Sequence, residues 1–488
     1  MRSSLLLAPI VAAVLSACAT GPAYHKPDIS VPASYKEGVG TPATNTPPPG
    51  WVAASPGDIE DRGAWWEVFG DPQLKELEAR ASKSNQSVQQ ALAALMVARS
   101  AVGVARSGYS PTISASSSAS RFHTSQNIVG RAGLAGRTVP DYSVGIDASW
   151  EPDLFSRVRH TVDAADARAQ ASSADLASVQ LSIHAELAVD YFDLLDTDAQ
   201  TALLQKTVAS YTSALALVQH RFDAGVASDL ELAQAETQLE TTRAQLVDLG
   251  VRRGQLEHAI ATMVGEPAST FTLQTNGIEL MPPTIPQGIP SQLLERRPDI
   301  AAAERRVAGS NADIGEAVSA FYPDLMLSVS GGFEASSVGS WLSMPSRFWA
   351  IGPALLGTIF DGGKRKHQLE GARAQYDQTV AVYRQTVLTA FQEVEDNLNA
   401  TRQLADEAGT QQKAVASAER ALQVALNRYQ AGAVGYLDVV TAQSIALSNE
   451  RVAADISRRQ MDASVLLVKA LGGPWSDSPA PTSAPHSS

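Results

Sequence analysis

Two long segments of the chain carry apolar residues at the spacing of a coiled coil. The first runs through Val208, Tyr211, Leu215, Val218 and Phe222, and the second through Val415, Ala418, Leu422, Ala425 and Tyr429. Steps of three and four residues average 3.5, which keeps one stripe of a helix facing a neighbouring helix. Because neither segment contains proline, we predict one helix over about 158–224 and another over about 365–431.

These two helices would be unusually long. At a rise of 1.5 Å per residue each would extend for roughly 100 Å. Helices in globular domains average about 11–12 residues, so the two rods indicate an extended, mainly α-helical architecture. A soluble coiled-coil scaffold has the same pattern, and the helices by themselves leave that alternative open.

Two shorter segments alternate apolar and polar residues, which is the pattern of a β-strand with two different faces. The apolar positions are Tyr142, Val144, Ile146, Ala148 and Trp150 in one segment, and Leu325, Leu327, Val329 and Phe333 in the other. Met326 is an exception to the alternation. Such strands are typical of membrane barrels, with apolar residues toward lipid and polar residues toward the lumen. Less regular partner strands are expected near 110–122, which is serine-rich, and near 348–360, which contains Pro353.

Each half of the chain therefore offers one hairpin, over about 109–154 and about 321–361. Four strands cannot close a barrel, since the smallest membrane barrels use about eight. An open sheet edge in lipid leaves backbone groups unpaired at a cost of several kcal/mol each, so several chains must pool their strands. No run of about 18 apolar residues follows Cys18, so we expect no membrane-spanning helix.

Short motifs recur in the same order, at an offset near 207 residues. They pair Ser107–Pro111 with Ser319–Pro323, Ala167–Gln170 with Ala372–Gln375, and Arg221–Gly225 with Arg428–Gly432. Self-similarity at a fixed offset indicates an internal duplication. We predict a first structural repeat over 64–287 and a second over 288–473.

The N-terminus has the layout of an export signal: Arg2, an apolar stretch over 5–15, and small residues before Cys18. The run Leu15–Cys18 resembles the bacterial lipobox, which implies that the signal peptide 1–17 is removed and that Cys18 is acylated. An ordinary secretory signal with an incidental cysteine is the alternative. Residues 18–63 are rich in Pro, Gly, Ala and Thr, so we expect an acylated extended tether there and a disordered tail over 474–488.

Composition narrows the classes of function. The formal net charge is −13, which argues against a nucleic-acid partner. Cys18 is the only cysteine, so neither an internal disulfide nor a cysteine metal cluster can form. The sequence has no His-x-x-x-His pair, phosphate-binding glycine loop or Gly-x-Ser-x-Gly elbow. We expect no enzyme, no metal site, and no cofactor other than the covalent lipid on Cys18.

Three motifs stand out along the duplicated chain. They are Trp65–Leu74 near the start, Leu293–Ile300 followed by Phe321–Pro323 in the middle, and Phe360–Gly363 at the entry to the second long helix. Together, and in this order, they resemble the TolC-type outer membrane factors, specifically the acylated branch called NodT-type efflux lipoproteins. The resemblance covers nearly all of the chain after Cys18.

This resemblance implies a homotrimer in the outer membrane of a Gram-negative bacterium. Three chains would form a twelve-stranded β-barrel in outer-membrane lipid, continued by a long α-helical coiled-coil barrel in the periplasm. A periplasmic adaptor (a membrane fusion protein) and an inner-membrane efflux pump of the RND class would dock at the far end. The implied function is a passive export duct that is gated at its periplasmic end; the alternative is a periplasmic coiled-coil scaffold lipoprotein without a pore.

The resemblance also assigns roles to the turns at which the long helices end. In the family an Arg-aromatic-x-x-Gly motif lies near the adaptor, and it is matched by Arg221, Phe222 and Gly225 in the first half and by Arg428, Tyr429 and Gly432 in the second. We expect adaptor contacts at these residues, with the glycines also ending the helices in left-handed conformation. Helix capping and heptad packing alone are the alternative.

Family members close the periplasmic end with side chains just after the second turn, here over 434–441. Asp438 is the only acid in this stretch, and Thr441 stands where some members carry a second aspartate. In a trimer three copies of Asp438 would meet near the axis and attract cations. We expect Asp438 to form the gate, with Leu437 or Tyr436 as an apolar constriction; a solvated aspartate on a helix surface is the alternative.

Overall fold

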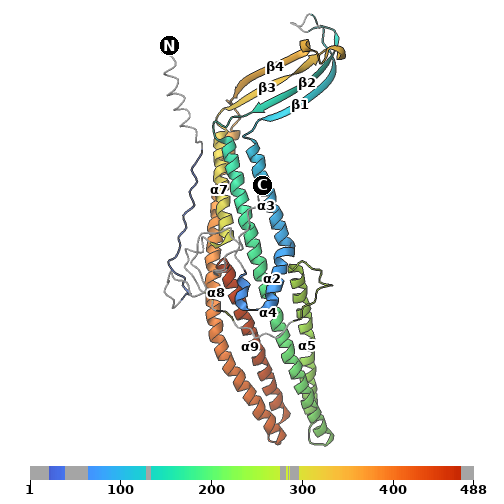
Figure 1. Cartoon of the computed structure of the whole chain (residues 1–488). Helices are drawn as coiled ribbons and strands as arrows, with labels where there is room; N and C mark the ends of the chain where they lie inside the picture. Colours follow the sequence, from blue (N-terminus) through green and yellow to red (C-terminus); the bar gives the residue numbers. More distant parts are fainter. Residues whose placement is uncertain are drawn as a thin grey trace. The chain divides into compact units, whose positions relative to one another are not determined.

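The helices form pairs of equal length in the two halves of the chain (Figure 1). A computed structural model describes residues 21–38, 64–127, 133, 135–274, 282–283, 285 and 296–473. The pairs are α3 (Gln86–Ser107) and α7 (Pro298–Ser319) with 22 residues each, α4 (Arg157–Asp223) and α8 (Lys364–Gln430) with 67, and α5 (Asp229–Met263) and α9 (Tyr436–Ala470) with 35. Both 67-residue helices begin and end within one residue of the ranges predicted from apolar spacing.

Several sequence predictions fall outside the described residues. These are Cys18, the signal segment 1–17, most of the tether 18–63, the tail 474–488 and residues 293–295 of the mid-chain motif. They stay predictions.

The described chain forms two compact units. The first takes the described residues of Met1–Asp28, Ala94–Ser172 and Ala303–Tyr383. The second takes those of Ile29–Ala93, Ser173–Ala302 and Arg384–Ser488. The first unit contains all four strands, and the second contains the main hydrophobic core and both turns that end the long helices.

The first unit holds a four-stranded antiparallel sheet in the order β1-β2-β3-β4. Its strands are β1 (Thr112–His123), β2 (Thr138–Trp150), β3 (Asp324–Ala335) and β4 (Arg347–Leu356), with the short helices η2 (Val338–Ser340) and η3 (Met344–Ser346) between the last two. In the register, Ser117 lies opposite Val144, Val144 opposite Phe333, and Phe333 opposite Arg347. Each of the two predicted hairpins is therefore present, and β2 pairs with β3 to join them.

The register sorts the side chains onto two faces, because alternate residues of a strand point to opposite sides. One face is largely apolar: Ile113, Ala115, Ala119, Tyr142, Val144, Ile146, Ala148, Trp150, Leu325, Leu327, Val329, Phe333, Trp349, Ile351, Pro353 and Leu355. The other is polar mainly on β1, β2 and β3, where it includes Ser114, Ser116, Ser118, Ser120, Ser143, Asp147, Ser149, Ser328, Ser330 and Glu334; on β4 it carries Phe348, Ala350, Gly352, Ala354 and Leu356. The serines of β1, which looked irregular in sequence, thus lie mostly on the polar face.

The prediction for the last strand was wrong at its end. The strand was expected to reach residue 360 but ends at Leu356, and Ile359 and Phe360 are largely exposed beyond it. The chain leaves the sheet there because Asp361 caps α8: its carboxylate accepts from the backbone N–H of Gly363 (3.0 Å) and Arg365 (3.3 Å). Pro353 lies on β4, at an edge of the sheet that one chain forms.

The opening motif anchors the core of the second unit. Trp65 lies in η1 (Trp65–Phe69) and packs into a cluster with residues of α2 (Pro72–Ser84), α4, α5 and α9. Asp71 caps α2, accepting from the N–H of Gln73 (2.8 Å) and Leu74 (3.2 Å), and its other oxygen accepts from the hydroxyl of Tyr191 (2.7 Å). The motif is therefore structural: it ties the start of α2 to α4.

Arg297 of the mid-chain motif is a buried residue with several ion pairs and hydrogen bonds in the same unit. The Arg297 guanidinium donates to Asp299 (2.9 and 2.6 Å), to Glu393 and to the carbonyl of Ala470 (3.3 Å). Its side chain is 9% exposed. One arginine thus links the start of α7 to α8 and to the end of α9.

By length and composition alone, one helical stretch of the described chain, Pro72–Ser107, is apolar enough to cross a membrane. The expectation that no helix spans the membrane stays a prediction, because this criterion rests on length and composition alone. The stretch meets the criterion through the many alanines of α3, together with Val and Leu, which raise its mean hydropathy. Core helices and signal sequences meet the same criterion, and Asn85 interrupts this stretch between α2 and α3.

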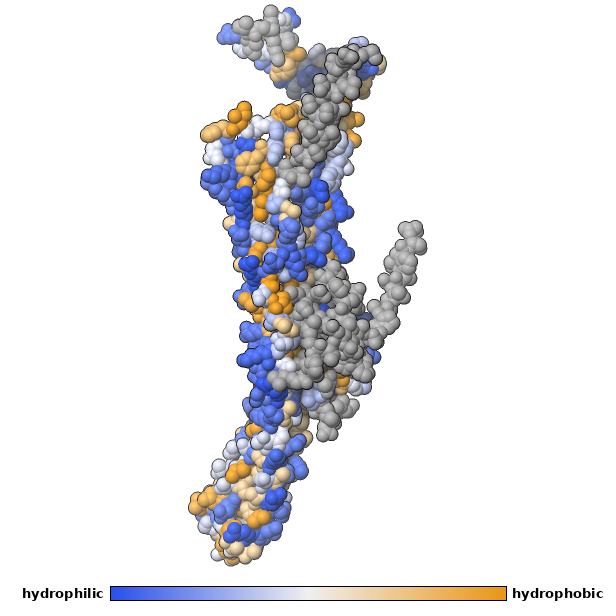
Figure 2. Space-filling view, turned by 90° about the vertical axis from the view of Figure 1, so that its left-hand side faces the viewer, coloured by the Kyte–Doolittle hydropathy of each residue, from blue (hydrophilic) through white to orange (hydrophobic). Residues whose placement is uncertain are grey.

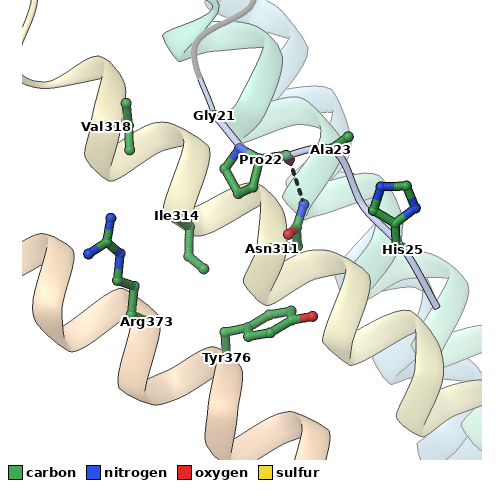
Figure 3. Close-up of a pocket in the computed structure, with 9 residues that line it drawn as sticks. All are labelled: Gly21, Pro22, Ala23, His25, Asn311, Ile314, Val318, Arg373 and Tyr376. Atoms are coloured by element: carbon green, nitrogen blue, oxygen red, sulfur yellow. Dashed lines mark hydrogen bonds between the residues drawn. The ribbon is translucent and has the colours of Figure 1, made fainter. Parts of the chain in front are cut away.

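The described part of the N-terminal tether, 21–38, has neither helix nor strand and lies against helices. In the first unit it borders a hollow of 540 Å³ beside α7 and α8, where Asn311 donates to the carbonyl of Pro22 (3.0 Å; Figure 3). In the second unit the N–H groups of Lys36 and Glu37 donate to the Glu395 carboxylate (2.7 and 2.9 Å). The tether is therefore bound to the helices at both places.

A carboxyl group lies buried beside the main core. Glu78 on α2 has a fully buried side chain, and one oxygen lies 2.6 Å from Nδ1 of His184 on α4. The ring of Trp66 covers His184 at 4.5 Å between centroids. Burial raises the pKa of Glu78 to about 7, and the hydrogen bond and charge of His184 oppose the rise only in part.

This carboxyl makes the stability of the core depend on pH. The folded pKa of Glu78 lies above its unfolded value of 4.5, so its contribution is fully present below about pH 4.5 and is lost as the pH rises through 7. We predict that Glu78→Gln removes this loss, which is on the order of 3 kcal/mol at pH 8. Thermal unfolding at pH 5 and pH 8 measures it, with exposed Glu76→Gln as the control. Equal pH slopes in wild type and Glu78→Gln would contradict the prediction.

Candidate functional site

The two long helices end in the same way. Gly225 and Gly432 each have φ of +72°, the left-handed region that glycine adopts without strain. In the first turn the N–H of Gly225 donates to the carbonyl of Phe222 (2.9 Å), and the N–H of the next residue donates to that of Arg221 (2.8 Å). In the second turn Gly432 and the residue after it make the equivalent bonds to Tyr429 and Arg428, at the same distances. This is the Schellman arrangement, so both glycines end a helix.

A small apolar cluster joins the two helical hairpins at these turns. It contains Val218, Ala227 and Ala235 from the α4–α5 hairpin and Tyr429, Tyr436 and Val439 from the α8–α9 hairpin. We call this part of the second unit, with its two turns, the tip. These side chains are more buried than those on the surrounding helix surfaces. Their packing holds the two hairpins together at the turns.

One arginine organises the tip. Arg221 donates to the carbonyl of Tyr429 (3.1 Å), and its guanidinium lies 4.5 Å from the centre of the Tyr429 ring. That ring packs edge-on against Tyr436 at 5.3 Å. Burial raises the pKa of Tyr436 to about 12 and also that of Tyr429. The cation–π contact and the hydrogen bond tie α4 to α8.

The two turns are not equivalent, although the sequence motif treats them alike. Arg221 is half-buried against Tyr429, whereas its counterpart Arg428 is exposed. Tyr429 is 2% exposed, and its counterpart Phe222 is 36% exposed. Of the residues predicted to contact an adaptor, Phe222 and Arg428 therefore present their side chains to solvent, and Tyr429 does not.

The predicted gate residues also differ in how far their side chains are exposed. Leu437 is 59% exposed and Asp438 is exposed, so both face solvent in the single chain. Tyr436 is 2% exposed because it packs in the tip cluster. In this conformation Tyr436 cannot line a constriction and instead supports the turn beneath Leu437 and Asp438.

Asp438 and its counterpart Glu231 in the first half are bonded differently. Ser228 and Glu231 cap α5 reciprocally: Glu231 N–H donates to the serine hydroxyl (3.3 Å) and Ser228 N–H to the glutamate (3.1 Å). At the equivalent places on α9 stand Gly435, which has no side chain to accept a bond, and Asp438. Within the described ranges no side chain or N–H pairs with the Asp438 carboxylate, so it stays available to solvent and ions.

The tip also carries exposed apolar side chains that the motif did not reveal. Val226 and Leu230 are 65% and 66% exposed and flank the first turn, near Phe222. Apolar surface is visible at the tip, at the bottom of Figure 2. Exposed apolar patches of this kind mark interaction surfaces. The sequence signal was present: two large apolar residues follow a helix-ending glycine, where turns are usually polar.

The residues that the structure describes contain no group of three His, Cys, Asp or Glu side chains placed to hold a metal. The tip therefore presents a surface with exposed acids, among them Asp438 and Asp229, and with exposed apolar side chains above a buried aromatic cluster. Such a surface can bind partners or restrict passage.

The comparisons with known proteins identify the family. The model of the outer membrane efflux protein family matches residues 77–266 and 289–473, which are most of the chain. The chain belongs to the outer membrane efflux protein family.

Individual family members resemble it over nearly their full length. The pyoverdine export outer membrane protein OpmQ of Pseudomonas aeruginosa is 30% identical over 470 residues, covering 95% of each chain. The cation efflux system protein CusC of Escherichia coli is 29% identical over 479 residues, covering 97% of this chain and 100% of that one. The structure of the outer-membrane channel OprN superposes with a TM-score of 0.82 at 29% identity, covering 94% and 100%.

Membership confirms several sequence predictions. Outer membrane efflux proteins are trimeric channels in which an α-helical barrel adjoins a β part, and they work with an adaptor and an inner-membrane pump. The predicted fold class, outer-membrane location and export function are confirmed. Family members are channel proteins, and the scaffold without a pore is not favoured.

Proposed function

We propose that this efflux protein is a passive duct, gated at the tip, through which a pump of the RND class exports its cargo. The observation that carries the proposal is the two-faced sheet together with the exposed acid at the tip. The apolar sheet face suits lipid and the polar face suits an aqueous lumen. The tip has no energy-converting chemistry, so energy would come from the pump.

The gate, in this proposal, consists of Leu437 and Asp438. Three copies of Asp438 around the trimer axis would bind cations, and three copies of Leu437 would narrow the passage. The Asp438 carboxylate accepts no hydrogen bond within the described chain, unlike that of its counterpart Glu231, so it is available to bind cations.

We predict that Asp438→Ala raises single-channel conductance in planar bilayers and weakens block by divalent cations several-fold, since three charges leave the constriction. The matched control is Asp229→Ala, which removes an exposed acid from the first turn of α5 at the same tip. Unchanged conductance and block in Asp438→Ala would refute the gate. A wild-type protein that is monomeric in detergent and does not conduct would refute the duct itself.

We further propose that the adaptor docks on the exposed apolar residues of the first turn, Phe222, Val226 and Leu230. These side chains are exposed, whereas Val218, Tyr429 and Tyr436 of the same tip are packed. Arg428, exposed at the second turn, would add a charge contact, while Arg221, Gly225, Tyr429 and Gly432 shape the turns.

Polar substitution should separate docking from folding. We predict that the double variant Val226→Ser, Leu230→Ser lowers co-purification with the cognate adaptor about tenfold or more, since buried apolar contacts dominate such interfaces. Trimer yield and conductance should stay at wild-type levels, because both side chains are exposed in the chain. The control is Val247→Ser, Val251→Ser, equally exposed but farther along α5. Full adaptor retention by the tip variant would exclude this surface.

We also propose that Cys18 carries the covalent lipid that anchors the chain. The lipobox-like run Leu15–Cys18 supports this, as does the absence of any second cysteine. We predict that radiolabelled palmitate enters the wild-type protein and not Cys18→Ser, measured by gel autoradiography. Comparable label in the Cys18→Ser protein would show that Cys18 is not the acylation site.

A further inference from the structure

Charged residues in the four strands divide cleanly between the two faces of the sheet. The acids Asp141, Asp147, Asp324 and Glu334 all lie on the polar face. The two arginines, Arg121 on β1 and Arg347 on β4, both lie on the apolar face. The register fixes this assignment, because Arg121 is in step with Ile113 and Arg347 with Leu355.

Both arginines are exposed, and neither guanidinium is paired within the residues that the structure describes. An unpaired cation on a lipid-facing strand is unfavourable at the centre of a bilayer and is tolerated only near the headgroups. The depth of Arg121 and Arg347 therefore decides whether the placement is stable.

The strands give that depth. Arg121 stands eight residues from Ile113, and Arg347 eight residues from Leu355, where the apolar face begins on each strand. Eight residues extend for about 27 Å along a strand, or roughly 20 Å along the membrane normal at the usual tilt. The apolar band of membrane barrels is about 25 Å tall, so both arginines lie at one boundary of the band.

That boundary is the outer one. The long helices start beyond Trp150 and Leu356, at the opposite end of the strands from both arginines, and the family extends its helices into the periplasm. Aromatic residues of the same face, Tyr142 and Trp349, lie within a few residues of this end, as in the girdle at a membrane interface.

The two arginines are on opposite edges of the sheet in one chain, since β1 and β4 are its edge strands. In a closed ring of identical chains β4 of one subunit lies beside β1 of the next. Arg347 of one subunit and Arg121 of its neighbour then flank the same seam. This step rests on the trimeric duct proposed above.

We propose that Arg121 and Arg347 form, at each subunit seam, a binding site for the phosphate groups of an anionic lipid of the outer leaflet. A guanidinium binds phosphate with two parallel hydrogen bonds, which suits it to this ligand better than a point charge. The adjoining apolar residues, Ala119 and Trp349, would contact the acyl chains. The lipid would thus bridge neighbouring subunits where the sheet edges meet.

Native mass spectrometry of the detergent-purified trimer tests the site, with diphosphorylated lipid A as the probe. We expect about three bound lipids per trimer in wild type, and an affinity about tenfold or more weaker in Arg121→Gln, Arg347→Gln, since each loses a charged hydrogen bond. Each single variant should lose most of the binding, because both arginines serve one site. The control is Arg384→Gln, Arg420→Gln, which removes two exposed arginines from α8.

Each other outcome overturns the proposal. Single variants that each lose half of the bound lipid would show two separate sites. Equal binding of phosphatidylcholine, or displacement by inorganic phosphate at matched concentration, would show that no anionic-lipid site exists. Because trimer mass and conductance are measured on the same samples, a non-trimeric or non-conducting wild type would instead point to failure of the duct.

Discussion

The unpaired edges of the four-stranded sheet constrain everything else in this protein. In lipid every backbone N–H and C=O must be satisfied within the protein, and one chain leaves the outer sides of β1 and β4 without partners. A single copy is therefore not a stable membrane structure. Pooling strands satisfies both edges at once, and in each subunit the long helices α4 and α8 follow β2 and β4 along the chain. Assembly of several chains follows from hydrogen bonding before any packing of the helices is considered, and the family sets the number of chains at three.

The internal duplication gives each chain two similar halves, and substitutions at a few positions make the two turns different. Helices of matched lengths, 22, 67 and 35 residues, supply two similar turns. Single changes then distinguish the turns. Gly435 in place of Ser228 removes the side-chain cap, Asp438 in place of Glu231 makes no bond back to the cap residue, and Tyr429 in place of Phe222 gives Arg221 an aromatic partner. One turn of each subunit can therefore restrict passage while the other presents apolar surface.

The spacing of apolar residues was sufficient to predict those helices and strands that depend on local sequence pattern. The long helices were located to within one residue because they lack proline and keep their apolar stripe throughout. The strands with clean alternation were also recovered. The end of β4 was misplaced because Ile359 and Phe360 continue an apolar pattern, whereas the Asp361 cap ends the strand.

The tip shows where local pattern is insufficient. Tyr436 and Leu437 are adjacent and both apolar in character, so the sequence did not indicate which would be buried. Packing between two hairpins more than 200 residues apart decides it: Tyr436 meets Tyr429 and Val218, and Leu437 faces outward. The unequal roles of Arg221 and Arg428 have the same origin, because only one of them reaches the ring of Tyr429.

The same cluster limits how a tip of this kind can open. Separating the α4–α5 hairpin from the α8–α9 hairpin would expose Tyr429, Tyr436 and Val439, which are nearly fully buried. At about 1.5–3 kcal/mol for each large apolar side chain, that separation costs on the order of 5 kcal/mol per subunit, before the contact between Arg221 and Tyr429 is lost. A movement that keeps the two hairpins together and shifts them against the neighbouring subunit leaves the cluster intact. Such a movement would spare the tip cluster and displace Leu437 and Asp438, which are exposed already.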